Sequence, residues 1–165
     1  MSVTADRHPW PVVERITSLI DGAVVAPRAD CFDIPVINPA TEERVSVLQE
    51  ADAAEVDAAV QAARRAFDSG SWPRMTLDAR KDILYCIRDL IRTHTDELAY
   101  LECLHSGLPI ARIREQIGRA ARNFEFFAEV ASTMRGETYT GLKGYLTYVT
   151  REPKGVGALI APWNA

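Results

Sequence analysis

The apolar run at residues 156–160 constrains the fold of this chain more than any other feature. It reads Val-Gly-Ala-Leu-Ile without a polar residue and lies between Gly155 and Pro162. A short apolar run bounded in this way is typical of a parallel strand that is buried on both faces. Such a strand needs a neighbour on each edge and helices on each face. We therefore predict the first strand of a doubly wound sheet, although residues 1–154 contain no set of βαβ partners for it.

Short strands are expected before any helix begins. Residues 1–16 predict a loosely held lead-in. Residues 19–25 predict two strand pieces around an Asp-Gly turn, which is a common hairpin signal. Residues 32–37 are rich in β-forming side chains, and residues 44–48 alternate between polar and apolar. Each of these two segments predicts a further short strand.

Helical patterns fill the middle of the chain. Asp52 followed by Glu55 fits a capping box, and the helix that follows carries one apolar stripe. The stripe consists of Val56, Ala59, Val60, Ala63 and Phe67. Thr76 is expected to cap a second helix, and Trp72 is expected to fill the gap between the two helices.

The second helix is expected to bury one face and to break near residues 93–95. Its buried face consists of Ile83, Leu84, Ile87, Leu90 and Ile91. A third, shorter helix then runs to about His105 and ends at Gly107. Pro109 suits the first turn of a fourth helix, which is expected to continue to about Met134. Residues 145–150 mix aromatic, β-branched and polar side chains and predict a half-exposed strand.

Composition and charge argue against several classes of partner. The chain has 165 residues, of which 47% are hydrophobic and 25% are charged, as expected for one globular domain with a core. The net charge of −4 argues against a nucleic-acid partner. No apolar run approaches the roughly 20 residues of a membrane helix, and the N-terminus has no signal-peptide pattern. We therefore expect a cytoplasmic protein with no membrane partner.

The cysteine and histidine patterns predict neither a disulfide framework nor a metal site. Cys31, Cys86 and Cys103 are an odd number and show no CxxC spacing. Cys86 and Cys103 lie in helical patterns and are expected to be small buried residues. The three histidines are scattered and form no HxxxH pair.

Seven sequence blocks, taken in order and at their spacing, resemble the N-terminal third of the aldehyde dehydrogenase superfamily. The blocks lie at residues 19–22, 37–41, 51–67, 71–75, 106–109, 136–138 and 151–164. Within the superfamily, residues 106–110 and 123–130 look most like those of the hydroxymuconate-semialdehyde dehydrogenases. The 5-carboxymethyl-2-hydroxymuconate type is the most similar of these.

This resemblance implies an α/β fold of which only the N-terminal helical and β part and the start of the doubly wound cofactor-binding sheet are present. Residues 17–136 would form the N-terminal strands and helices of the cofactor-binding domain. Residues 137–153 would form strands of an oligomerisation arm, and residues 154–165 would begin the dinucleotide-binding fold. The full-length protein would be a homo-oligomer, either a dimer or a tetramer.

The resemblance also implies an activity. Family members oxidise an aldehyde to an acid through a cysteine thiohemiacetal and pass hydride to NAD or NADP. Asn164 matches the asparagine that stabilises the oxyanion, and an amide suits this role because it is a donor that does not titrate. Ile160, Ala161, Pro162 and Trp163 match positions that contact the cofactor. Without the other blocks, Asn164 is better interpreted as a turn residue and Trp163 as a core residue.

The remaining machinery of the family lies downstream of Pro-Trp-Asn. It comprises a nucleophilic cysteine, a glutamate base, a cofactor-binding lysine and a glycine-rich turn, and no cysteine of this chain matches the nucleophile. We therefore expect an N-terminal fragment, inactive alone, of an NAD(P)-dependent semialdehyde dehydrogenase that is truncated before its catalytic cysteine. The alternative is a non-catalytic helical and arm module that binds a family subunit. The aldehyde and the choice between NAD and NADP stay open, because the strand that normally sets the cofactor is absent.

Overall fold

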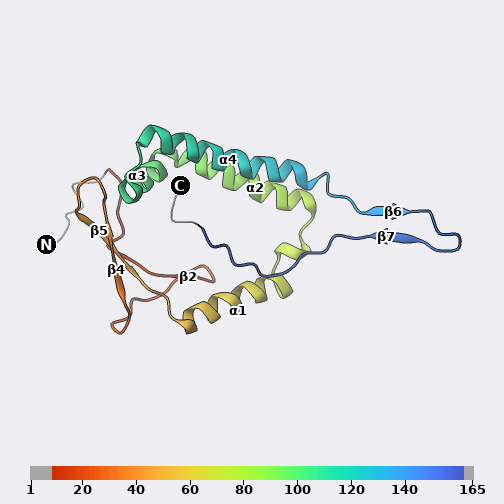
Figure 1. Cartoon of the computed structure of the whole chain (residues 1–165), viewed down its shortest axis with the longest axis horizontal. Coiled ribbons are helices and arrows are strands. Elements are labelled where there is room, and N and C mark those ends of the chain that lie inside the picture. Colours follow the sequence, from red (N-terminus) through yellow and green to blue (C-terminus); the bar gives the residue numbers. More distant parts are fainter. Residues whose placement is uncertain (1–8, 162–165) are drawn as a thin grey trace.

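The computed structural model describes residues 9–161 of the chain. A small sheet lies at one end, three packed helices and a separate helix follow, and a two-stranded hairpin projects from the other end (Figure 1). The last described segment returns from the hairpin toward the body of the protein (Figure 1). The arrangement is open, and many large apolar side chains of the described residues are exposed.

The sheet has three strands in the order β1-β5-β4. Strand β5 (Arg44–Gln49) is central, with β4 (Asp33–Ile37) antiparallel and β1 (Arg15–Ile16) parallel to it. A register shift between Val36 and Ile37 interrupts the antiparallel pairing. The strands expected at residues 32–37 and 44–48 are confirmed. Strand β1 falls at the end of the expected lead-in, which is therefore paired there rather than loose.

The predicted Asp-Gly hairpin is confirmed. Strands β2 (Leu19–Ile20) and β3 (Ala23–Val24) pair antiparallel around Asp21 and Gly22. Both turn residues have positive φ, 53° and 78°, as two-residue hairpins require. Arg65 of the first helix donates to the carboxylate of Asp21 at 3.2 Å and so joins the turn to that helix.

Helix α1 (Ala53–Ser69) begins at the expected cap. The carboxylate of Asp52 accepts a hydrogen bond from the backbone N–H of Glu55 at 2.8 Å. A full capping box also requires the Glu55 side chain to accept from the backbone N–H of Asp52. This part of the prediction is wrong, because the side chain of Glu55 instead accepts from Ser18 at 2.8 Å. The apolar stripe of this helix is largely uncovered within the described residues, since Val56 is 55% exposed and Val60 is also exposed.

A 3₁₀ turn (Trp72–Arg74) joins α1 to the helical bundle. Trp72 is exposed, so the prediction that it fills a gap between helices is wrong. Helix α2 (Leu77–Thr93) begins at Thr76, whose hydroxyl accepts from the N–H of Ala79. Its predicted buried face is only half-buried, and Leu90 is exposed.

The predicted break in the helical region is confirmed at His94, where α2 ends and α3 (Thr95–Ser106) begins. Gly107 ends α3 with φ 71°, as expected. A methyl group at Gly107 would lie 2.5 Å from Cγ of Pro39, so the backbone also approaches the loop after β4 closely.

Helix α4 (Ile110–Ala131) packs along α2 and against α3. Pro109 lies at its N-cap rather than in its first turn, and the helix ends three residues before the expected Met134. The buried residues of α4 are Ile113, Ala121 and Ala128. Two of the three are alanines, which allow close approach of neighbouring helices.

Strands β6 (Glu137–Tyr139) and β7 (Thr147–Val149) form the projecting hairpin. The strand expected at residues 145–150 is confirmed in its central part, but its residues are exposed rather than half-exposed. The helix face formed by α2, α3 and α4 does not cover this hairpin (Figure 1).

Candidate functional site

The segment that follows the hairpin carries the residues predicted to act in chemistry. Residues 151–161 form no helix or strand. Leu159 is 100% exposed and Ile160 is 93% exposed. The prediction of a buried parallel strand at residues 156–160 is therefore wrong for this chain.

The cause lies in the missing neighbours rather than in the run itself. A parallel strand gains its stability from ladder hydrogen bonds on its edges and from helices on its faces. The sheets of the described residues lie elsewhere, and none of their strands pairs with residues 156–160. Without partners, the run stays extended with its apolar side chains in solvent.

Two of the five predicted site residues are described. Ile160 and Ala161 follow one another in the extended, exposed segment. Pro162, Trp163 and Asn164 lie outside the described residues. Among the described residues, the predicted site is thus represented by Ile160 and Ala161, which are neighbours in the chain.

This segment approaches the body of the protein at Gly155. Gly155 has φ 103°, and a methyl group added to it would lie 3.1 Å from Nη1 of Arg64 on α1. Arg64 is held in turn by Asp68, with Nε 2.9 Å from Oδ2. Its guanidinium also lies over the ring of Phe67, 4.6 Å from the centroid.

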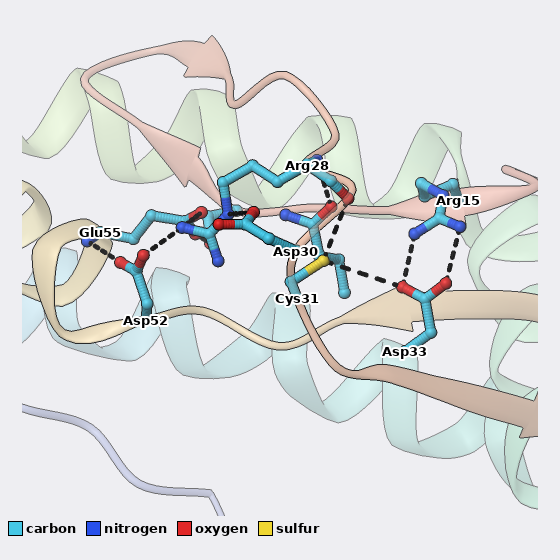
Figure 2. A network of polar contacts seen from close by, with 9 residues as sticks. Arg15, Arg28, Asp30, Cys31, Asp33, Asp52 and Glu55 are labelled. Carbon is cyan, nitrogen blue, oxygen red and sulfur yellow. Dashed lines mark hydrogen bonds and ion pairs between the residues drawn. The ribbon is translucent and has the colours of Figure 1, made fainter.

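A second polar cluster surrounds Arg28, between the first strands and α1 (Figure 2). The Arg28 guanidinium forms an ion pair with Asp52 and lies 3.0 Å from Oε1 of Glu55. The backbone N–H of Arg28 donates to Gln49 at 2.8 Å. Glu55 and Gln49 are both buried, so this cluster joins the end of β5, the loop before β4 and the start of α1.

Hydrogen bonds and ion pairs lower the pKa of two carboxyl groups in this region, those of Asp52 and Asp33. The N–H of Glu55 and, secondarily, the Arg28 guanidinium lower the pKa of Asp52 below its ordinary value. Nearby, Arg15 donates to both oxygens of Asp33 at 2.5 and 2.7 Å and lowers the pKa of that carboxyl (Figure 2). Each carboxylate is paired with an arginine, so the cluster has the chemistry of a structural ion-pair network.

The cysteines of the described residues are not joined in a disulfide. Cys31, Cys86 and Cys103 are free. The Cys31 thiol donates to the carbonyl of Arg28 at 3.2 Å. Cys86 is exposed, so the prediction that it is buried is wrong, and Cys103 is half-buried.

Residues 9–161 also lack a grouping suited to a metal ion. No three histidine, cysteine, aspartate or glutamate side chains of that part of the chain converge as ligands. None of its helices combines the length and apolar character needed to cross a bilayer.

Comparison with known proteins shows the family of this chain. Residues 26–165 match the Aldehyde dehydrogenase family. The chain belongs to the aldehyde dehydrogenase family. The match runs through the exposed segment and the Pro-Trp-Asn sequence, so the predicted superfamily and the aldehyde dehydrogenase-like α/β fold class are confirmed.

Two curated aldehyde dehydrogenases illustrate the similarity. Aldehyde dehydrogenase 1 of Tanacetum cinerariifolium is 44% identical over 131 residues, which is 78% of this chain and 26% of that protein. The 2-hydroxymuconic semialdehyde dehydrogenase of Pseudomonas sp. strain CF600 is 36% identical over 157 residues, which is 92% of this chain and 32% of that protein. The chain thus spans between a quarter and a third of the length of these relatives.

A solved aldehyde dehydrogenase structure shares the fold. The NAD+ complex of the Bacillus cereus enzyme aligns with a TM-score of 0.75 at 37% identity. The alignment covers 82% of this chain and 28% of that one. NAD+ is therefore a cofactor within the family, as the resemblance implied.

Sequence reasoning missed the two arginines on which these contacts depend. The spacing of Arg64 and Asp68 is that of a helical i,i+4 pair, so their ion pair could have been predicted. Gly155 and Arg64 are 91 residues apart in the sequence, so no local sequence pattern indicated that they would lie close together. Arg28 lies in a loop, and nothing in its neighbourhood indicated that it would meet Asp52 and Glu55.

Proposed function

We propose that this chain is the N-terminal part of an NAD(P)-dependent aldehyde dehydrogenase that oxidises a semialdehyde to a carboxylic acid through a cysteine thiohemiacetal. The family match over residues 26–165 carries this proposal, because it includes the whole segment in which site residues were predicted. The similarity to a 2-hydroxymuconic semialdehyde dehydrogenase supports a semialdehyde substrate of aromatic-compound catabolism.

We assign two roles to this chain, a hydrogen bond to the oxyanion and contacts with the cofactor. The Asn164 carboxamide would donate a hydrogen bond to the oxyanion, and losing one such donor typically costs a factor of about 10²–10³ in kcat. Ile160, Ala161, Pro162 and Trp163 would contact the cofactor, which accepts the hydride when bound. An extended backbone with apolar side chains, as at residues 159–161, suits one wall of a dinucleotide site. The other walls and the nucleophile would come from residues beyond these.

The domain boundaries follow from the same assignment. Residues 1–16 are proposed as a lead-in and residues 17–136 as part of the cofactor-binding domain. Residues 137–153 are proposed as an oligomerisation arm, and residues 154–165 as the start of the dinucleotide fold. The exposed apolar hairpin supports the arm, and with it a homo-oligomer as the full-length form. A cytoplasmic location is part of the same proposal.

A chimera tests the proposed chemistry. Residues 1–165 replace the matching region of the Pseudomonas semialdehyde dehydrogenase, and absorbance at 340 nm reports aldehyde-dependent NAD(P)H formation. We expect turnover from the chimera, a loss of about 10²-fold or more in kcat from Asn164→Ala, and no turnover from residues 1–165 alone. An Asn164→Ala chimera with unchanged kcat would contradict the oxyanion role.

The alternative proposal is a non-catalytic module that binds a family subunit. The exposed hairpin and the unpaired apolar run at residues 156–160 favour it, because both present edges on which another chain could pair. A chimera without turnover, together with co-purification of residues 1–165 with the intact relative, would support this alternative over the first.

A further inference from the structure

Gly155 is where the chain after α4 returns to the body of the protein. Among the described residues 132–161, every residue except Gly155 is exposed. Within this part of the chain, Gly155 is therefore the one position that is half-buried rather than exposed. The contact lies on α1, whose Arg64 faces Gly155.

Two neighbouring side chains hold the Arg64 guanidinium next to Gly155. Asp68 accepts from Nε at 2.9 Å and also from Nη2. The ring of Phe67 lies under the guanidinium plane. This leaves Nη1 directed at Gly155, because the planar fork of arginine moves as one unit.

Gly155 is suited to this place by both conformation and size. Its φ of 103° is a backbone conformation that residues with a side chain rarely adopt. A methyl group at this position would also crowd Nη1 of Arg64 at 3.1 Å and Cζ at 3.9 Å. Gly157, two residues later, has neither constraint, since no atom lies within 4 Å of the same added group.

We propose that Arg64 is a positioning residue that seats Gly155 against α1 and so sets the direction in which residues 156–161 leave the hairpin. We call this placement of Gly155 against Arg64 the seat. Ile160 lies five residues after Gly155, and five extended residues span at most about 18 Å. A change of direction at Gly155 therefore displaces Ile160. The effect of the seat on catalysis rests on the proposed function. The existence of the seat is independent of that function.

Limited trypsin cleavage of the 165-residue chain tests the seat. The bond between Lys154 and Gly155 lies at the contact, so Arg64 is expected to slow its cleavage. We expect Arg64→Ala to speed cleavage at this bond by about tenfold, because cleavage follows the population of the open form. Asp68→Asn, which loosens the hold on Arg64, should have the same effect to a smaller degree.

Arg65→Ala is the matched control for the cleavage experiment. Arg65 is the next residue of α1 and pairs with Asp21 rather than with Asp68 or Gly155. Its substitution should leave the rate at Lys154 unchanged, while circular dichroism shows the same helix content in both variants. Equal cleavage rates for Arg64→Ala, Arg65→Ala and the unaltered chain would overturn the proposal.

A spectroscopic test separates the seat from general stability. The Nε–H cross-peak of Arg64 in a ¹⁵N NMR spectrum is assigned by its loss in Arg64→Ala. Gly155→Ala should move this cross-peak, whereas Gly157→Ala should leave it in place. Movement in both variants, or in neither, would show that Gly155 is not seated on Arg64.

The chimera described above separates this inference from the proposed function. In it, Arg64→Ala should lower kcat about tenfold with little change in KM, since misplacing a reacting group affects the chemical step. Faster cleavage with unchanged kcat would overturn the positioning role. A chimera without any turnover would count against the proposed function, while the cleavage and NMR results still decide whether the seat exists.

Discussion

At the scale of single residues, arginines join parts of the chain that lie far apart in sequence. Arg28 meets Asp52 and Glu55, Arg15 meets Asp33, and Arg64 faces Gly155. In each case a planar guanidinium with several donors satisfies a carboxylate or approaches the backbone. These contacts hold the edges of an open fold that has few buried apolar side chains among its described residues.

Asp52 gives the first prediction, a dependence of stability on pH. Its pKa in the folded protein lies below the ordinary value of 3.8, so the folded state favours its ionised form. The stabilisation is therefore fully present above the unfolded-state pKa and is lost as the pH falls through the folded-state pKa. Urea unfolding between pH 2 and pH 6 should show stability declining as the pH falls below about 4.

Asp52→Asn is the control for this dependence. Asparagine caps a helix about as well as aspartate, but it neither titrates nor pairs with Arg28. The variant should therefore be less stable near pH 6 and should lose less stability on acidification. If the free energy of unfolding fell equally steeply with pH in the two proteins at acid pH, this part of the pH dependence could not be assigned to Asp52.

At the scale of elements, the helices were more predictable than the surfaces they bury. Asp52, Thr76 and Gly107 mark helix ends through hydrogen bonds or backbone conformations that are local in sequence. Burial depends on neighbours, and so the stripe on α1 and Trp72 are exposed although their patterns predicted otherwise. On α4, the buried positions include small residues, while two adjacent phenylalanines face solvent.

Helix α4 gives the second prediction, which reverses the order expected from side-chain size. Ile113 is 0% exposed, whereas Phe127 is 62% exposed. Ile113→Ala should destabilise the chain by about 2–5 kcal/mol, because it removes buried methyl groups and leaves a cavity. Phe127→Ala should change the free energy of unfolding by no more than about 0.5 kcal/mol.

Urea denaturation followed by circular dichroism at 222 nm measures both values. The two substitutions lie on the same helix and replace an apolar residue by the same alanine, so helix propensity is closely matched. A larger loss of stability for Phe127→Ala than for Ile113→Ala would show that the aromatic face of α4 is covered in solution.

At the scale of the whole molecule, the projecting hairpin determines the shape. An isolated two-stranded hairpin is at best marginally stable in water, and this one has no helix packed on either face (Figure 1). Its apolar side chains include Tyr139, Leu142, Tyr145, Leu146 and Tyr148, and all are exposed. Such a surface is expected to pair with another chain.

The hairpin gives the third prediction, which concerns association. Leu146 is 75% exposed at the hairpin, and Leu146→Asp should weaken self-association because a charge would have to be buried at the contact. Sedimentation velocity over a range of protein concentrations measures the change. Phe127→Asp, at a comparably exposed apolar residue of α4, should leave association unchanged. Equal weakening by both variants would assign the association to general apolar exposure rather than to the hairpin.

The sequence by itself determined the local structure and the family of this protein. Turns, caps and helix stops follow from the conformational preferences of a few neighbouring residues, and so the hairpin at Asp21, the cap at Thr76 and the stop at Gly107 were all predictable. The ordered blocks likewise predicted the aldehyde dehydrogenase family. Tertiary structure alone decided what each apolar surface meets, because burial and strand pairing depend on partners distant in sequence. The run at residues 156–160 has the composition of a buried strand, yet it stays extended and exposed because no described strand pairs with it, and it meets the fold through the contact of Gly155 with Arg64.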